Sequence, residues 1–213
     1  MPLLPRIARP VVSALALAAL AGANGGCGIF GVIAHKAAGP VKHPALFALP
    51  KEPTLVIVER GNNPPEAATD AQRVASEVAR LLKENNAVTV VDPGLAIEVR
   101  SKPGEDGGRP RPTEIARACG ATQLIYVDLT RYETSQAVAG EAVDGQVEAA
   151  VWVVDARTAQ VRWPLQANQG YAVAAAVPFK PADSRNTEQG VRDEMNKDLG
   201  TRVARLFYLW TEE

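Results

Sequence analysis

A strand, a helix and a second strand follow one another with short links, and this order constrains the fold more than any other feature of the sequence. Thr54–Val58 (TLVIV) and Ala87–Asp92 (AVTVVD) are short apolar runs rich in β-branched residues, the pattern of buried strands. Between them, apolar residues recur at helical spacing from Thr69, where a capping-box sequence begins, to Asn85-Asn86. Two strands joined through a helix predict parallel pairing with a right-handed crossover.

The rest of the chain predicts a short helix, three strands and a long helix. A loop rich in glycine and proline (Ser101–Pro112) precedes the short helix, which Thr113 is expected to cap and Gly120 to end. The later strands and the last helix are predicted at Gln123–Tyr132, at Gln146–Asp155, at Gln160–Trp163 with a continuation at Tyr171–Val177, and at Thr187–Trp210. The three strands indicate an antiparallel meander, and Gly190 and Gly200 are expected to weaken the last helix. The predicted fold class is therefore α/β: a small mixed β-sheet with a βαβ unit, a short helix, a meander and a long C-terminal helix.

The first residues of the chain bear on where the protein is located. Two arginines precede an uncharged apolar run, Val11–Ala23, which is followed by small residues and Cys27. This is the layout of a secretory signal peptide. Gly25-Gly26-Cys27 resembles the lipobox of bacterial lipoproteins, although Asn24 stands where that family usually has leucine. The resemblance implies that Cys27 receives a diacylglyceryl thioether and that the signal is cut directly before it.

An uncleaved membrane helix is the alternative reading of the same stretch. No charged residue occurs from Val11 to Ala34, which is long enough to span a bilayer, although five glycines inside it weaken such a helix. Either anchor attaches the rest of the chain to a membrane, outside the cytoplasm. Gly28 follows the cysteine where aspartate would favour the inner membrane, so resemblance to Gram-negative lipoproteins slightly favours the outer membrane.

Three segments are expected on these grounds. Residues 1–26 would be the signal peptide, residues 27–53 a lipid-anchored flexible tether that contains four prolines, and residues 54–213 a single α/β periplasmic domain. A domain of roughly 150 residues is large enough to bury its own core.

Charge and cysteine usage exclude several classes of function. The net charge is −1 and no block of lysine or arginine stands out, whereas a nucleic-acid surface needs a basic patch. With Cys27 consumed by lipid, Cys119 is alone, so we expect no intrachain disulfide and a small buried hydrophobic residue at this position. The two histidines, His35 and His43, lie in the tether, too far apart and too unsupported to form a zinc site or activate a nucleophile.

Two sequence segments resemble the periplasmic domain of several envelope lipoproteins. These segments are Gly120–Val127 (GATQLIYV) and Val153–Val161 (VVDARTAQV), the second followed by Trp163. The family includes the curli-secretion lipoprotein, the penicillin-binding-protein activator lipoprotein and the N-terminal domain of TolB. It usually has glycine where this chain has Ala159, so the turn is expected to differ here.

Three further motifs resemble a group of uncharacterised bacterial lipoproteins. They are Gly26–Gly31 (GCGIFG), Val90–Pro93 (VVDP) and Val203–Tyr208 (VARLFY). Both resemblances imply a fold and a location in the cell envelope, and neither implies a catalytic residue, a cofactor or a metal.

Acidic residues at strand ends are the remaining place for chemistry. Glu59, Asp92 and Asp128 follow three strands of the predicted sheet, where parallel strands would bring them to one edge. Three carboxylates could bind a divalent cation or act as acid and base. Two hypotheses follow: a non-enzymatic envelope module that binds an unidentified envelope protein, which is the favoured one, and a metal-dependent or hydrolytic periplasmic enzyme.

Overall fold

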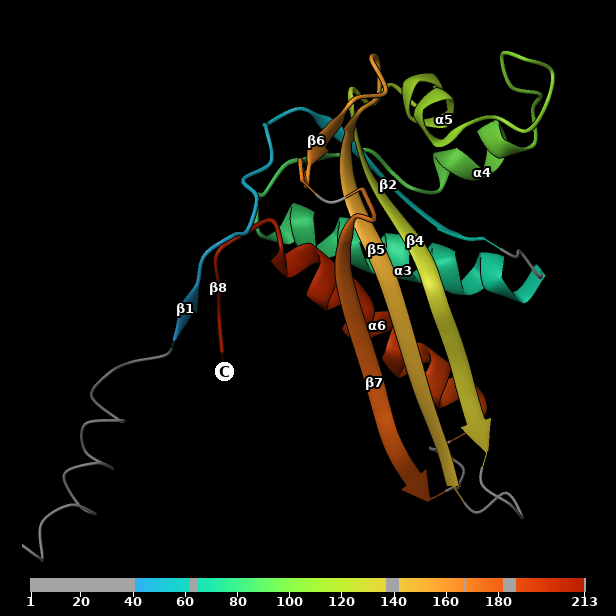
Figure 1. Ribbon diagram of the computed structural model, residues 1–213, viewed down its shortest axis with the longest axis vertical. Coiled ribbons are helices and arrows are strands. Elements are labelled where there is room, and N and C mark those ends of the chain that lie inside the picture. The colour runs from blue at the N-terminus through green and yellow to red at the C-terminus, as the bar shows by residue number, and fades with distance from the viewer. Residues whose placement is uncertain (1–40, 62–64, 137–141, 167, 182–186, 213) are drawn as a thin grey trace, which may run out of the picture. The chain divides into compact units, whose positions relative to one another are not determined.

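The computed structural model describes residues 41–61, 65–136, 142–166, 168–181 and 187–212, in two compact units (Figure 1). Cys27 and His35 lie outside these residues. The smaller unit holds β1 (Lys42–His43) and the end of β8 (Trp210–Thr211), which form a two-stranded sheet. In it, the amide of Glu212 donates to the carbonyl of Val41, 3.2 Å away. None of the helices in the described ranges is long and apolar enough to cross a bilayer.

The larger unit, Pro44–Trp210, contains the α/β fold. Its elements in chain order are β2 (Pro53–Arg60), α3 (Pro65–Glu84), β3 (Thr89–Val90), α4 (Leu95–Arg100), α5 (Pro112–Ala118), β4 (Gln123–Gln136), β5 (Ala142–Asp155), β6 (Val161–Trp163), β7 (Tyr171–Pro181) and α6 (Glu188–Arg205).

One mixed sheet organises this unit, as predicted. Its strand order is β3-β2-β4-β5-β6, and β7 also pairs with β5. Strand β2 runs parallel to β3 and to β4, so β2, α3 and β3 form the predicted βαβ unit. Strands β4 and β5 are antiparallel, as are β5 with β6 and β5 with β7, which confirms the meander.

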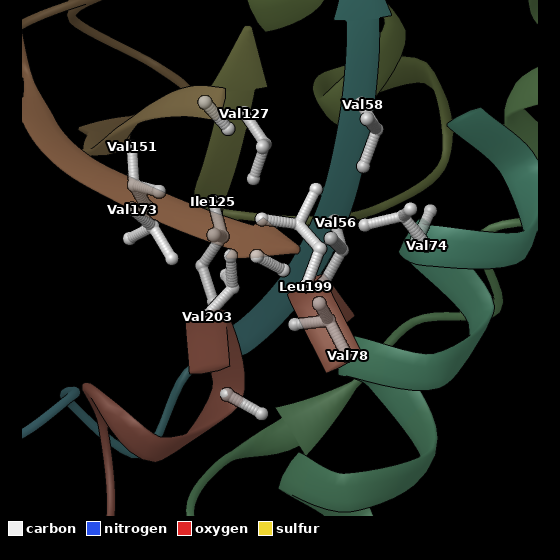
Figure 2. Close-up of a cluster of buried hydrophobic side chains, with 14 of the residues drawn as sticks. Val56, Val58, Val74, Val78, Ile125, Val127, Val151, Val173, Leu199 and Val203 are labelled. Atoms are coloured by element: carbon white, nitrogen blue, oxygen red, sulfur yellow. The ribbon is translucent and has the colours of Figure 1, made fainter. Parts of the chain in front are cut away.

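Helices cover the two faces of the sheet unequally. The long helices α3 and α6 pack on one face, and the short helices α4 and α5 pack on the other (Figure 1). Strand β4 shows the alternation that produces both faces: Ile125, Val127 and Leu129 join the larger core, and Leu124 joins the smaller one. Figure 2 shows the larger core, which contains Val56, Val58, Val74, Val78, Ile125, Val127, Val151, Val173, Leu199 and Val203. Full burial of one such side chain contributes about 1.5–3 kcal/mol.

Two helices begin earlier than their polar residues predicted. Helix α3 starts at Pro65 instead of Thr69, and α5 starts at Pro112 with Arg111 as its cap instead of Thr113. The reason is the same in both: proline is preorganised for the first position of a helix and has no N–H to leave unpaired there. The Glu114 carboxylate accepts from the Arg111 amide at 3.2 Å, so the acidic residue predicted for the first turn does stabilise it.

Helix α6 begins where predicted and ends early. The Thr187 hydroxyl accepts from the Gly190 amide at 3.1 Å, which is an N-cap bond. The helix ends at Arg205 instead of Trp210. Gly200 is not simply a weak point, because an added Cβ would lie 2.8 Å from Cβ of Glu77 on α3. Glycine at this position therefore permits the close approach of the two long helices.

The compact unit starts at Pro44, inside the segment expected to be tether. Leu49 is buried, the Phe47 ring stacks on Trp163 with centroids 6.0 Å apart, and the amide of Phe47 donates to the Leu206 carbonyl. These residues belong to a short apolar run between Pro44 and Pro50, which is flanked by prolines and shows no periodicity of a helix or strand, so the sequence did not predict that it packs on the domain. The strand predicted at Ala87–Asp92 is shorter in the structure, where β3 comprises only two residues.

The turn after β5 keeps a left-handed residue although this chain has alanine there. Ala159 has φ +59°, a conformation that costs an L-residue roughly 1–2 kcal/mol. We expect Ala159→Gly to raise the free energy of unfolding by about 0.5–1 kcal/mol, since part of the relief is offset by the freer unfolded chain. Urea denaturation would measure it. Ala68→Gly, on the exposed side of α3, is the control and should destabilise by about 1 kcal/mol. If both variants lost the same free energy of unfolding, Ala159 would not be strained by its left-handed backbone conformation.

Candidate interaction surface

The three strand-end acids do not form one site. Glu59 and Asp128 are neighbours in the β2–β4 register. Asp92 lies elsewhere, because β3 pairs only with the first residues of β2, and its carboxylate accepts from the Gly94 amide at 2.8 Å. Within the described residues, no group of three or more metal-ligating side chains converges.

Glu59 is held by neighbouring side chains. Its carboxylate lies 3.5 Å from the Arg100 guanidinium and 3.7 Å from that of Arg109, and it accepts from the Tyr126 hydroxyl at 3.3 Å. Burial, together with the charges of Glu59 and Asp128, raises the pKa of Tyr126 well above its usual value. This phenol therefore stays protonated and acts as a donor, and the cluster connects β2, β4 and α4.

Cys119 and His43 are the cysteine and the histidine within the described residues. Cys119 is half-buried at the end of α5, where burial raises the pKa of its thiol. A thiol with a raised pKa is less ionised and so less reactive. In the smaller unit, His43 Nε2 lies 3.2 Å from a carboxylate oxygen of Glu212.

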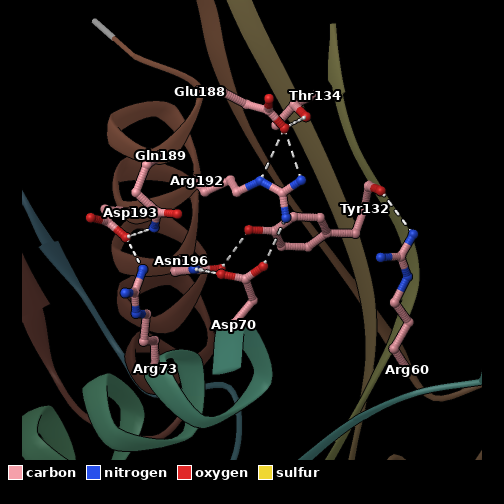
Figure 3. A network of polar contacts seen from close by, with 10 residues as sticks. All are labelled: Arg60, Asp70, Arg73, Tyr132, Thr134, Glu188, Gln189, Arg192, Asp193 and Asn196. Atoms are coloured by element: carbon pink, nitrogen blue, oxygen red, sulfur yellow. Dashed lines mark hydrogen bonds and ion pairs between the residues drawn. The ribbon is translucent and has the colours of Figure 1, made fainter. Parts of the chain in front are cut away.

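A buried polar network joins α3, α6 and β4 (Figure 3). Asp70 is only 5% exposed, and its carboxylate accepts from Asn196 Nδ2 at 2.9 Å and from Arg192 at 3.3 Å. The Tyr132 hydroxyl donates to Asn196 Oδ1 at 3.0 Å. Burial raises the pKa of Tyr132, with a further contribution from Asp70, so this hydroxyl remains a donor. Each polar group has a partner, which indicates a structural clamp.

A hollow of about 560 Å³ opens beside this network, between the second and third turns of α3 and the first turn of α6. Its charged side chains are paired: Arg192 with Glu188 at 2.8 Å and with Asp70 at 3.3 Å, and Arg73 with Asp193 just outside the lining. Glu188 also accepts from the Thr134 hydroxyl at 3.0 Å, and the pairing with Arg192 lowers the pKa of Glu188. The hollow therefore presents ion pairs whose partners are already satisfied.

Asp155 organises the turn in the segment that resembles envelope lipoproteins. Its carboxylate accepts from the amides of Arg157 and Thr158, both at 2.9 Å, and from the Arg162 guanidinium at 2.5 Å. Arg162 also donates to Gln123, which is fully buried. The Thr158 amide first, and then Arg162, hold the pKa of Asp155 far below its usual value. These charge-assisted bonds fix the end of β5 against the start of β4.

We expect Asp155→Asn to lower the free energy of unfolding by about 1–2 kcal/mol at pH 7, because a neutral amide keeps the amide bonds but loses the charge facing Arg162. The lowered pKa sets the pH dependence. A carboxyl group whose pKa is lowered by folding stabilises the folded state at pH values above its pKa in the unfolded chain, which is near 4. That contribution disappears as the pH falls towards the folded-state value. Urea denaturation should therefore give a difference between wild type and variant that is constant from pH 7 to 5 and shrinks below pH 4. A difference independent of pH would contradict this role for the Asp155 charge.

The far side of the meander carries a shallow surface, which we call the open face. It is the side of β4, β5 and β7 opposite α3 and α6, beyond the end that α4 and α5 cover (Figure 1). A hollow of about 590 Å³ on it has alanines along β5 and β7, Trp152 at one end and the acids Asp128 and Glu148 at its side. The Trp152 ring packs against Tyr126, with centroids 5.7 Å apart, and against Gly170.

Strand β7 borders the open face and has one unpaired edge. It pairs with β5 on one side, and within the described ranges no strand pairs with its other side (Figure 1). Val173, Ala175 and Val177 are buried, and the residues between them, Ala172, Ala174 and Ala176, are exposed. From Tyr171 to Val177 the strand has no charged residue. Sheet edges are usually protected by charges, prolines or bulges. In β7 these features come after Val177, as Pro178, Lys180, Pro181 and a register shift against β5, so the segment Tyr171–Val177 is suited to pairing with another strand.

The sequence predicts extended structure at Tyr171–Val177 as a continuation of the strand that begins at Gln160, and Pro164 between the two parts indicates an edge or a break. Two features of the sequence are compatible with an open edge. The segment carries no charge, and its run of alanines is small and apolar enough for either face of the strand to be buried. Edge position itself depends on the pairing of β7 with β5, which the pattern of one strand does not specify.

Searches of known protein families and of curated proteins find no match to this chain. Solved structures do match. Lipoprotein GNA1162 from Neisseria meningitidis is 17% identical, covering 72% of this chain and 98% of its own, with a TM-score of 0.41. The PelC dodecamer from Paraburkholderia phytofirmans is 16% identical over 79% of this chain and 96% of that chain, with a TM-score of 0.37.

A further match is an uncharacterized lipoprotein B from Nitrosomonas europaea. It is 15% identical over 74% of this chain and 82% of that chain, with a TM-score of 0.36. Bacterial lipoproteins are therefore among the solved structures to which this chain is similar.

Proposed function

We propose that this chain is a bacterial envelope lipoprotein whose α/β domain is a non-enzymatic module for binding another protein chain. The observation that carries the proposal is the N-terminal sequence: two arginines, the uncharged run Val11–Ala23, and Gly25-Gly26-Cys27. In this proposal residues 1–26 are removed and Cys27 carries the lipid. The domain then faces the periplasm, with the outer membrane slightly favoured over the inner.

The distance between domain and membrane follows from the tether. If the tether runs from Cys27 to the start of the compact unit at Pro44, it spans on the order of 20 Å as a flexible coil. A domain held so close to the bilayer meets partners that are themselves in or on that membrane. This geometry suits a module that acts through its surface.

The polar clusters of the domain support a binding role over a chemical one. Asp70, Asp155 and Glu59 are each engaged by arginine, amide or hydroxyl donors from neighbouring elements. Groups that are fully engaged in holding elements together are poorly placed to exchange protons with a substrate. The open face and the β7 edge, by contrast, present surface and backbone groups available to a partner.

Intact-mass spectrometry of the membrane-extracted protein tests the anchor. We expect wild type to begin at Cys27 and to carry added acyl mass, and Cys27→Ser to lack that mass. Cys119→Ser is the matched control, since the chain has only these two cysteines, and it should keep the acyl mass of wild type. A wild-type chain that retains residues 1–26 without acyl mass would mean a spanning helix in place of a lipid.

A further inference from the structure

We propose that β7 is a self-association edge, at which two copies of this chain join their sheets through antiparallel β7–β7 pairing. The proposal names the partner in the binding role proposed above and rests on that role, but not on the lipid anchor. It follows from three properties of β7: an edge that no strand of the described residues pairs, the uncharged segment Tyr171–Val177, and two distinct faces.

The edge supplies hydrogen-bonding groups that pairing would satisfy. In an antiparallel strand alternate residues direct their N–H and C=O groups to opposite sides, and β5 takes those on one side of β7 only. A second strand of similar length would take the others. Because β7 spans Tyr171–Pro181, the edge is long enough for more than a single pair of bonds.

The two faces of the strand determine the symmetry of the pair. Residues directly opposite in an antiparallel pair have their side chains on the same face. For the buried row of one copy to meet the buried row of the other, opposite residues must therefore both be odd-numbered or both even-numbered. If the two-fold axis passes midway between a residue and its own copy, odd-numbered residues lie opposite odd-numbered ones, as required. If the axis passes between two successive residues, odd-numbered residues lie opposite even-numbered ones, and the buried rows do not meet.

Ala174 is the residue at which that axis fits best. It is the centre of the uncharged segment Tyr171–Val177, so the pairing uses the whole segment and leaves Pro178, which has no N–H, outside. Every opposed pair in this register consists of alanine, valine or tyrosine. No charge then faces a like charge, which would destabilise the pair.

The alternative occupant is an extended segment of a different protein. A second copy is favoured because β7 complements itself: in this register buried Val173 meets buried Ala175, Val177 meets the apolar ring of Tyr171, and each exposed alanine meets an exposed alanine. A dissimilar strand would need a matching uncharged alternation of its own.

Disulfide trapping in full-length protein tests the register. Single cysteines replace Ala172, Ala174 or Ala176 in a Cys119→Ser background, in membranes, with the background alone as a blank. Residues on the axis would have Cα atoms about 4.5–5.5 Å apart, within disulfide reach. We expect dimer to form at Ala174→Cys in at least tenfold higher yield than in the control Glu148→Cys. Glu148 lies directly opposite Ala174 on β5, and two copies of it would be about 14 Å apart, beyond reach.

A charge variant tests the same contact without cysteine. Ala174 is exposed, so Ala174→Lys should leave the fold intact while placing two lysines opposite each other at the axis. Light scattering of the detergent-extracted protein should show wild type and Ala174→Ser as dimers and Ala174→Lys as a monomer. The monomer should still unfold in one cooperative transition, at a lower melting temperature because the partner no longer stabilises the folded state. Any of four results would overturn the proposal: a monomeric wild type, a dimer that survives Ala174→Lys, equal disulfide trapping at all positions, or trapping to a different protein. The acyl-mass measurement is read separately, so failure of one does not imply failure of the other.

Discussion

Asp70→Ala is expected to lower the free energy of unfolding by about 3 kcal/mol. Asp70 is 5% exposed and accepts hydrogen bonds from Asn196 at 2.9 Å and Arg192 at 3.3 Å. Removing one partner of a buried charged pair typically costs 3–5 kcal/mol, since the other is left without compensation. Arg192 keeps its pairing with Glu188 and is 24% exposed, so the lower end of that range applies. Urea denaturation with linear extrapolation would measure the change.

Asp193→Ala is the matched control for Asp70→Ala. Asp193 also pairs with an arginine across the two helices, Arg73, but its side chain is 54% exposed. Exposed ion pairs contribute about 0–1 kcal/mol, so this variant should lose much less stability. Similar losses in both variants would show that burial does not set the strength of the α3–α6 clamp.

The importance of Asp70 illustrates what the sequence could not provide. In the sequence it lies inside the capping-box pattern that starts at Thr69, and such residues usually face solvent at a helix start. Because α3 begins at Pro65, Asp70 instead lies in the second turn, where it faces Asn196. That partner is more than a hundred residues away, and no local pattern links the two.

Strands and their faces, by contrast, could be predicted well. Apolar residues alternate along Gln123–Tyr132, a pattern that predicts Ile125 and Val127 on one face and Leu124 on the other, and the structure confirms each. Period-two burial is a local property that each strand carries in its own residues. The βαβ unit was predictable for the same reason, because its chirality and pairing follow from short links.

The candidate sites needed tertiary information that the sequence lacks. Glu59 and Asp128 were predicted to be close and are register neighbours, whereas Asp92 was wrongly grouped with them because β3 pairs only with the start of β2. The position of a strand's end in the sheet depends on which residues pair with the neighbouring strand, and not on the order of the strands in the chain. Cys27 lies outside the described residues, and its lipidation stays a prediction.

Gly170→Ala is the second substitution with a large expected effect, a loss of about 3 kcal/mol. Gly170 has φ +77°, which costs an L-residue roughly 1–2 kcal/mol. An added Cβ would also lie 2.6 Å from the ring of Trp152, and overpacking of this kind costs about 1–3 kcal/mol. Because Gly170 directly precedes β7 and Trp152 lies on the open face, the clash would disturb the surface proposed for pairing.

Gly107→Ala separates the two contributions to the Gly170→Ala loss. Gly107 has nearly the same backbone conformation, φ +76°, but an added Cβ there meets nothing within 4 Å. It should cost only the conformational part, about 1 kcal/mol. In a Trp152→Leu background the cost of Gly170→Ala should fall towards the same value, because the ring that the added Cβ meets is gone. Urea denaturation of the four proteins in this double-mutant cycle would give the coupling free energy between Gly170→Ala and Trp152→Leu. A Gly170→Ala cost that is unchanged without the Trp152 ring would mean that backbone strain alone makes glycine necessary at the start of β7.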